Sequence, residues 1–352
     1  MLMKTIIVDV MGGDNAPLET VKGVARAAAE FGDDIKYILV GDIVQIEAVA
    51  RENSISLDRF DIVHTESVIT MNDEPISVVR GKEFSSMSMG LRMLKEGRGD
   101  AFVSTGNTGA LFTGANLIVR KIKGVKRPAI ATVLPLQTPV LLVDSGANVV
   151  VTPEYLEQFA IMGSAYMKNI MNVDSPRVGL LNNGEEEHKG TELQIETYKL
   201  LRESKTVNFV GNIEGNRVMQ NTCDVIVADG FTGNIFLKTL EGLGKMMLKT
   251  IKTALYSKIR TRAAGLLIKS EMQGIRKTFD AGEFGGAPIL GISKPVIKAH
   301  GSSNAKAFKN AIRQAIAYCD TDISGEIESA LKVAADKKAA REAAKFAEKE
   351  EK

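Results

Sequence analysis

Short apolar runs alternate along the chain with longer amphipathic stretches. Nine runs end in glycine or polar residues, namely TIIVDVMGGDNAP, YILVGD, IVHTES, AFVSTGN, AIATVLP, VLLVDSGAN, VGLLNNGEE, NFVGNIEG and VIVADGFTGN. Several are continuously apolar, which is typical of strands buried on both faces of a parallel sheet. Stretches between them, such as LETVKGVARAAAEF and GTELQIETYKLLRE, have helical periodicity. Alternating strands and helices predict a three-layer α/β/α sandwich.

The composition is that of an ordinary soluble globular protein, with 352 residues, 44% of them hydrophobic and 25% charged. Two cysteines, Cys223 and Cys319, argue against a disulfide scaffold, and the chain has no CxxC pair that would suggest structural zinc. Asp9 interrupts the first apolar run, so a signal peptide is not indicated, and no run approaches the roughly 18 residues of a membrane span. We expect a cytoplasmic protein with one two-lobed domain over residues 1–335 and a charged helical or disordered tail over 336–352.

Four polar corners follow predicted strands, where α/β sheets bind their ligands. They are DVMGGDNAP (Asp9–Pro17), STGNTGA (Ser104–Ala110), NNGEEEHKG (Asn182–Gly190) and ADGFTGN (Ala228–Asn234), called the first to fourth corners below. Glycine lets backbone N–H groups approach an anion, and a helix N-terminus adds donors and partial positive charge. The alternative is that these residues only cap helices and form turns.

Neither GxxxxGK[ST] nor a GxGxxG opening a helix is present, so a phosphate bound at the corners is expected to be a small one or one end of a non-nucleotide ligand. No metal or cofactor is expected. The predicted phosphate-binding residues are Thr105, Gly106, Asn107, Thr108 and Gly109. Further candidates for the cleft are Asp9, Gly12, Gly13, Asp14, Asn183, Asp229 and Thr232.

The third corner adds a cation to these neutral donors. Glu185–Glu187 precede His188 and Lys189. Lys189 either pairs with one of the glutamates, at a gain of at most about 1 kcal/mol, or lies in the cleft and neutralises a phosphate or a developing oxyanion. We treat His188 as a neighbour rather than a base. His64 and His300 are the only other histidines, and with no GxSxG elbow a Ser-His-Asp triad is not indicated.

A basic segment follows the fourth corner. Between Lys245 and Lys277 the chain carries nine Lys or Arg residues and one acid, Glu271, with apolar residues at helical spacing. This pattern predicts a basic amphipathic helical hairpin at about 243–280. Such a hairpin is expected to pack as a dimer contact, to face an anionic membrane or to bind an acidic protein. The basic residues are not interleaved with aromatic residues, which argues against binding of nucleic acid. The candidate contact residues are Lys258, Arg260, Arg262, Leu266, Leu267, Ile268 and Lys269.

Taken together, these motifs resemble the PlsX family of acyl-acyl carrier protein:phosphate acyltransferases. The matching stretches cover roughly residues 4 to 330 and include DVMGGDNAP, STGNTGALFTGANL, LVDSGAN, LLNNGEEEHKGTEL, NFVGNIEGN, VIVADGFTGNIFLKTLEG and FGGAPILGISKPVIKAHGSSNAKAFKNAI. The resemblance implies a Rossmann-like fold similar to isopropylmalate dehydrogenase and phosphotransacetylase. It also implies a homodimer and peripheral association with the membrane.

The resemblance further implies the reaction. A long-chain acyl group passes from acyl carrier protein to inorganic phosphate, and a membrane glycerol-3-phosphate acyltransferase consumes the acyl phosphate in phospholipid synthesis. The catalytic lysine and asparagine of the family fall on Lys189 and Asn234. The alternatives are a phosphotransacetylase-like enzyme that uses short-chain acyl-CoA and a non-catalytic scaffold that binds acyl carrier protein at a membrane.

Overall fold

The computed structural model describes residues 3–134, 136–256, 268, 270, 272, 274 and 285–350, with side chains except at 338 and 341–350. Its strands form one eleven-stranded sheet in the order β3-β2-β1-β4-β11-β10-β5-β6-β9-β7-β8. Their bounds are β1 (Lys4–Asp9), β2 (Ile35–Gly41), β3 (Phe60–His64), β4 (Ala101–Ser104), β5 (Ala129–Leu134), β6 (Val140–Val143), β7 (Arg177–Asn182), β8 (Asn208–Glu214), β9 (Val225–Val227), β10 (Ala287–Leu290) and β11 (Val296–Lys298).

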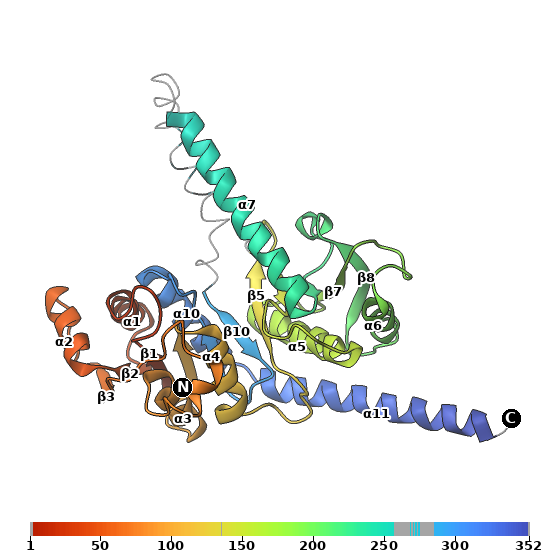
Figure 1. Cartoon of the computed structure of the whole chain (residues 1–352), viewed down its shortest axis with the longest axis horizontal. Coiled ribbons are helices and arrows are strands. Elements are labelled where there is room, and N and C mark those ends of the chain that lie inside the picture. Colours follow the sequence, from red (N-terminus) through yellow and green to blue (C-terminus); the bar gives the residue numbers. More distant parts are fainter. Residues whose placement is uncertain are drawn as a thin grey trace.

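Helices cover both faces of this sheet. Their bounds are α1 (Leu18–Phe31), α2 (Ile43–Glu52), α3 (Ser86–Lys95), α4 (Thr108–Gly114), α5 (Pro153–Met171), α6 (Glu192–Arg202), α7 (Gly230–Tyr256), α10 (Ala305–Cys319) and α11 (Ile323–Glu350), with short turns η1 (Pro75–Val78), η2 (Ala115–Val119) and η3 (Arg217–Gln220). Figure 1 shows α1, α2 and α3 near β1–β3 at one end, and α5 and α6 near β7 and β8 at the other.

Alternation of side chains along each strand builds two core layers. Val8 of β1 packs in one cluster with Phe159 of α5 and Phe308 of α10. Its neighbour Ile7 points to the other face and packs in a cluster with Leu91 of α3. Because both faces of the strands are buried, the continuous apolar runs of the sequence are explained, and the three-layer α/β/α architecture is confirmed.

The centre of the sheet departs from the parallel pairing that the sequence predicted. Parallel pairs join β3, β2, β1, β4 and β11 in one half, and β6, β9, β7 and β8 in the other. Between the halves, β10 is antiparallel to both β11 and β5, and β5 is antiparallel to β6. Three reversals in succession mean that the strands of the two halves run in opposite senses.

Two long helices project from the body (Figure 1). Helix α7 begins at Gly230, inside the fourth corner, and packs Leu237 with its neighbours Phe236 and Leu240 over one face of β6 and β9. Residues 243–256 of the predicted hairpin therefore belong to a helix that starts well before residue 243, and most of the remaining hairpin residues lie outside the described part of the chain. Helix α11 buries Ile323 and Ile327 in the core and extends through most of the expected tail. The domain boundary placed at 335 stays a prediction.

Candidate active site

The first and second corners lie side by side because β1 and β4 are parallel neighbours. The carboxylate of Asp9 is buried and accepts a hydrogen bond from the Ser104 hydroxyl (2.7 Å) and another from the backbone N–H of Met11 (3.2 Å). Burial raises the pKa of Asp9, against the lowering effect of these hydrogen bonds. The Asp9 carboxylate therefore links the two corners through hydrogen bonds.

Glycines allow the backbones of these corners to touch. A Cβ at Gly12 would lie 2.7 Å from the backbone N and Cα of Gly106, which no side chain tolerates. Gly13 has φ of +95°, and a Cβ there would lie 2.6 Å from the hydroxyl oxygen of Thr105. Both candidate glycines are thus required by contact between the corners, whatever ligand the corners hold.

Two of the predicted phosphate donors make hydrogen bonds within the protein. The hydroxyl of Thr105 donates to the carbonyl oxygen of Gly12. The amide of Asn107 donates to the carbonyl oxygens of Thr70 (3.2 Å), Met71 (3.3 Å) and Asp73 (3.1 Å), while its Oδ1 caps α4 by accepting from Ala110 N–H (3.1 Å). Thr108, at the start of α4, is exposed. Phosphate binding by these side chains stays a prediction.

A third loop, Lys298–Ser303 after β11, completes this half of the site. The backbone N–H of Asp14 donates to Gly301 O (2.9 Å), which joins this loop to the first corner. The Lys298 ammonium donates to Thr105 O (3.2 Å), which joins it to the second. Sequence reasoning did not include Lys298 among the site residues. The signal was available, since PVIKAHGSSN is also an apolar run that ends in a polar, glycine-containing cluster.

The fourth corner is the N-terminus of α7. The Asp229 carboxylate accepts from the backbone N–H groups of Phe231 (3.0 Å) and Thr232 (2.9 Å) and from the Thr232 hydroxyl (2.7 Å). Asp229 and Thr232 are therefore occupied in capping the helix. Asn234, one turn further along the helix, is exposed. Its side chain packs against Gly146, where an added Cβ would lie 3.5 Å from it.

Gly146 belongs to the loop Asp144–Asn148 after β6, which supports Asn234. Asp144 is buried and accepts from the backbone N–H groups of Gly146 (3.1 Å), Ala147 (3.0 Å) and Asn148 (2.6 Å). Burial raises its pKa, although these bonds lower it. None of these residues was among the predicted site residues, although the run VLLVDSGAN carries the same strand-end pattern as the four corners.

The third corner neighbours the fourth, because β7 and β9 are parallel neighbours. Glu185 pairs with Arg217 (3.1 Å) and Glu187 pairs with Arg202 (2.5 Å). Lys189 is half-buried, and its carbonyl oxygen accepts from the Asn182 amide (3.1 Å). Within the described part of the chain its ammonium forms no ion pair, so the local pairing with a glutamate is absent there. Asn183 is exposed.

Charged side chains on helix α7 influence the pKa values of residues in the other half of the candidate site. Loss of hydration lowers the pKa of His300, and the positive charges of Lys238 and Lys298 lower it further. Lys238, two turns into α7, also lowers the pKa of Lys298. Charges on α7 therefore act on the loop after β11, although the strands that lead to the helix and to the loop run in opposite senses.

The predicted membrane or carrier contacts are almost all without a described position. Lys258, Arg260, Arg262, Leu266, Leu267 and Lys269 fall outside the described residues, whereas Ile268 is described and exposed. No described helix is long and apolar enough to cross a membrane. Among the described residues, no three His, Cys, Asp or Glu side chains are grouped as metal ligands would be.

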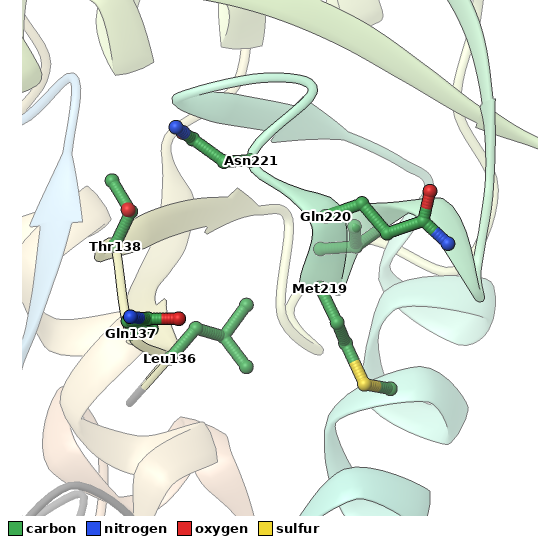
Figure 2. A pocket seen from close by; sticks show the side chains of 7 residues that line it. Leu136, Gln137, Thr138, Met219, Gln220 and Asn221 are labelled. Carbon is green, nitrogen blue, oxygen red and sulfur yellow. The ribbon is translucent and has the colours of Figure 1, made fainter.

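A small pocket of about 230 Å³ is lined by residues that precede β6 and β9 in the chain. Figure 2 shows Leu136, Gln137 and Thr138 on one side of it and Met219, Gln220 and Asn221 on the other. It contains none of the predicted site residues.

Comparison with known proteins identifies the family. A family model described as "Fatty acid synthesis protein" matches residues 4–325. The phosphate acyltransferase of Thermoanaerobacterium thermosaccharolyticum is 43% identical over 332 residues, which cover 94% of this chain and 98% of that protein. The phosphate acyltransferase of Acetivibrio thermocellus is 45% identical over 317 residues, with coverages of 90% and 93%. The chain belongs to the phosphate acyltransferase family.

Solved structures of phosphotransacetylases share the fold of this phosphate acyltransferase family member. The enzyme from Streptococcus pyogenes matches with a TM-score of 0.59 at 17% identity, and EutD from Staphylococcus aureus with 0.57 at 15%. Each match covers 90% of this chain and 94% of the other. At such identities the likeness shows the fold alone, and it confirms the Rossmann-like, phosphotransacetylase-type fold that the motifs predicted.

Proposed function

We propose that the protein transfers a long-chain acyl group from acyl carrier protein to inorganic phosphate. A phosphate oxygen attacks the thioester carbonyl, a C–O bond forms, the C–S bond breaks, and the thiolate leaves and takes a proton from water. Phosphate is already a nucleophile and a thioester already has a good leaving group, so the protein has to position them and stabilise the oxyanion. The observation that carries the proposal is that a member of the phosphate acyltransferase family has two polar loop clusters, each at the carboxyl ends of neighbouring parallel strands.

In this proposal the two halves divide the work. Phosphate binds at the second corner, where Thr108 and Gly106–Gly109 face the ligand, while Thr105 and Asn107 hold the corner in shape. Lys189 and Asn234, in the other half, act on the carbonyl oxygen of the thioester. The role of Lys189 is supported by its half-buried position and by the lack of an ion pair to its ammonium group within the described part of the chain. The role of Asn234 is supported by its exposed position beside a rigid loop.

Turnover tests the reaction and its donor. Purified protein is mixed with phosphate and long-chain acyl-acyl carrier protein, long-chain acyl-CoA or acetyl-CoA, and acyl phosphate is trapped as a hydroxamate. We expect product with the long-chain carrier thioester. Preference for acetyl-CoA would indicate the phosphotransacetylase-like alternative, and no product from folded protein with any donor would indicate the scaffold.

Two substitutions test the residue roles. Lys189→Ala and Asn234→Ala should fold normally and each lose about 2.7–4 kcal/mol of transition-state stabilisation, or roughly a hundredfold to a thousandfold in kcat. Lys199→Ala on the exposed side of α6 and Asn208→Ala at the amino end of β8 are matched controls that should keep wild-type turnover. Unchanged turnover in both site variants would remove Lys189 and Asn234 from the mechanism.

We further propose that the protein is a homodimer that works at the membrane surface in the cytoplasm. Helix α7 exposes the apolar residues Phe231, Ile235, Leu243, Met246 and Met247, which supports an apolar contact between copies. The basic segment beyond α7 suits acidic acyl carrier protein and an anionic bilayer that contains a glycerol-3-phosphate acyltransferase. Arg260→Gln with Arg262→Gln and Lys269→Gln should weaken binding to the carrier or to anionic liposomes, and unchanged binding to both would refute this role.

A further inference from the structure

Lys298 is a lysine buried at the carboxyl end of β11, beside the second corner. Its exposed fraction is 8%. Parallel pairing of β11 with β4 sets Lys298 opposite Ser104, and its Nζ donates to the carbonyl oxygens of Thr105 (3.2 Å) and Ala299. An ammonium group has three donors. One donor of Lys298 is therefore left over beyond the two carbonyls that hold the group in place.

The charge of Lys298 lacks a contact ion pair in the described part of the chain. Asp14 and Asp9 act on it only through space, and the carboxylate of Asp9 is engaged by Ser104 and Met11. Burial of an ammonium without a paired anion is unfavourable, and burial lowers the pKa of Lys298 to about 8. An anion in the second corner would offset this cost.

We propose that Lys298 is the cation that binds the phosphate dianion in the second corner. The inference rests on the proposed function and deepens it, because it gives the phosphate its countercharge from the same half of the molecule. The two carbonyls hold the ammonium in position, and its third N–H donates to a phosphate oxygen as a charge-assisted hydrogen bond. Lys189 is then free to act on the acyl carbonyl.

Steady-state kinetics of three variants test the assignment. Lys298→Met removes the charge and keeps the length of the side chain, and Lys298→Arg keeps the charge. Lys294→Met is the matched control, since Lys294 precedes the same strand at its amino end and donates to Gly99 O (3.2 Å). We expect Lys298→Met to raise the KM for phosphate about tenfold to a hundredfold, as for a lost hydrogen bond to a charged group. The KM for the acyl donor should change less than about twofold in all three variants.

A structural role of Lys298 would give a different result. Loss of support for Thr105 and Ala299 would lower kcat, alter both KM values and reduce the melting temperature without phosphate. Such a combined change would overturn the proposal, as would a wild-type KM for phosphate in Lys298→Met.

A binding measurement separates this inference from the proposed reaction. Phosphate that binds only the folded protein raises its melting temperature, with no acyl donor required. Inorganic phosphate, compared with chloride at equal ionic strength, should stabilise the wild type and Lys294→Met but not Lys298→Met. If the wild type forms no acyl phosphate, this shift still decides the role of Lys298. Equal phosphate-dependent shifts in all variants would overturn it.

The pH profile supplies a test that does not require Lys298→Met to fold. The charges that face Lys298 are Asp9, Asp14 and Lys238, with His300 on its own loop. Lys298 is protonated below its pKa of about 8 and neutral above it, so the KM for phosphate should rise as the pH passes that value. Lys298→Arg stays charged throughout and should show a flatter profile. Phosphate itself ionises in the same way in both experiments. Profiles of the KM for phosphate that run parallel in the wild type and in Lys298→Arg would therefore refute the proposal.

Discussion

Gly233→Ala should move the start of α7 and with it Asn234. Gly233 is buried where the first turn of the helix meets the loop after β6. A Cβ at this position would lie 2.0 Å from the carbonyl oxygen of Asp144. That oxygen belongs to a backbone fixed by the buried Asp144 carboxylate and its bonds to Gly146, Ala147 and Asn148. The loop cannot yield easily, so the helix has to shift.

The size of the shift follows from the contact distance. Ordinary packing needs at least about 3 Å between these atoms, so the helix start must move by about 1 Å, at a typical overpacking cost of about 1–3 kcal/mol. A 1 Å misplacement of a catalytic group can reduce the rate about a hundredfold. Because Asn234 follows Gly233 directly, we expect a loss of about that size in kcat, with less effect on the KM for phosphate, which in the proposed function binds in the other half.

The control lies on the same helix. A Cβ at Gly242 meets nothing within 4 Å, and Gly→Ala inside a helix stabilises by about 0.5–1 kcal/mol. Hydroxamate trapping gives kcat and KM, and urea denaturation gives the free energy of unfolding. Gly242→Ala should be as active as the wild type and slightly more stable. The reasoning fails if Gly233→Ala is equally active, because Asn234 would then tolerate the displacement or play no part in the reaction.

Two further predictions concern stability. Arg177 binds buried Asp224 through Nε (3.0 Å) and Nη2 (2.9 Å) at the amino ends of β7 and β9. Burial opposes ionisation of Asp224, but the bonds from Arg177 outweigh it and hold its pKa below the ordinary 3.8. Arg177→Met should cost about 2 kcal/mol at neutral pH. The difference in unfolding free energy should shrink as the pH falls below about 4, where the carboxylate becomes protonated; a difference independent of pH would refute the role of the pair. Asn107→Ala should cost about 2 kcal/mol, because it removes a helix cap and three hydrogen bonds to carbonyl oxygens. Thermal unfolding measures this, and a loss below about 0.5 kcal/mol would contradict the assigned bonds.

The local parts of the fold are legible in the sequence. Lys4–Asp9 contains the apolar run Ile6–Val8, which is followed by Asp-Val-Met-Gly-Gly, so both the strand and the turn after it could be predicted. Leu18–Phe31 has the spacing of an amphipathic helix and forms α1 over those residues. Such features depend on residues that are neighbours in the chain. The corner Ser104–Ala110 between a strand and a helix is another feature of this kind.

Features that depend on tertiary contacts were not predictable in this way. Ala287–Leu290 is short and contains Pro288, and its antiparallel place between β11 and β5 appears only in the sheet. The composition of the second corner indicates donors for an anion, but it does not reveal that the loop Thr70–Asp73 occupies the Asn107 amide. The run PVIKAHGSSN marks a polar strand end, but its position beside the second corner, with Lys298 opposite Ser104, follows only from the pairing of β11 with β4.

The reversal at the centre of the sheet divides the predicted site residues into two clusters. Loops after parallel strands gather at one edge, as the first and second corners do with the loop Lys298–Ser303. The third and fourth corners gather in the same way in the other half, but their strands run in the opposite sense. A continuous parallel sheet would place all four corners at the same edge. Phosphate and an acyl thioester would then bind to similar loops at that edge. Here each half has its own cluster, and the positive charge of Lys238 on α7 acts on Lys298 and His300 of the first cluster. In the function proposed above, the two clusters would provide separate sites for the phosphate nucleophile and the thioester electrophile, which suits a transfer between two unlike substrates.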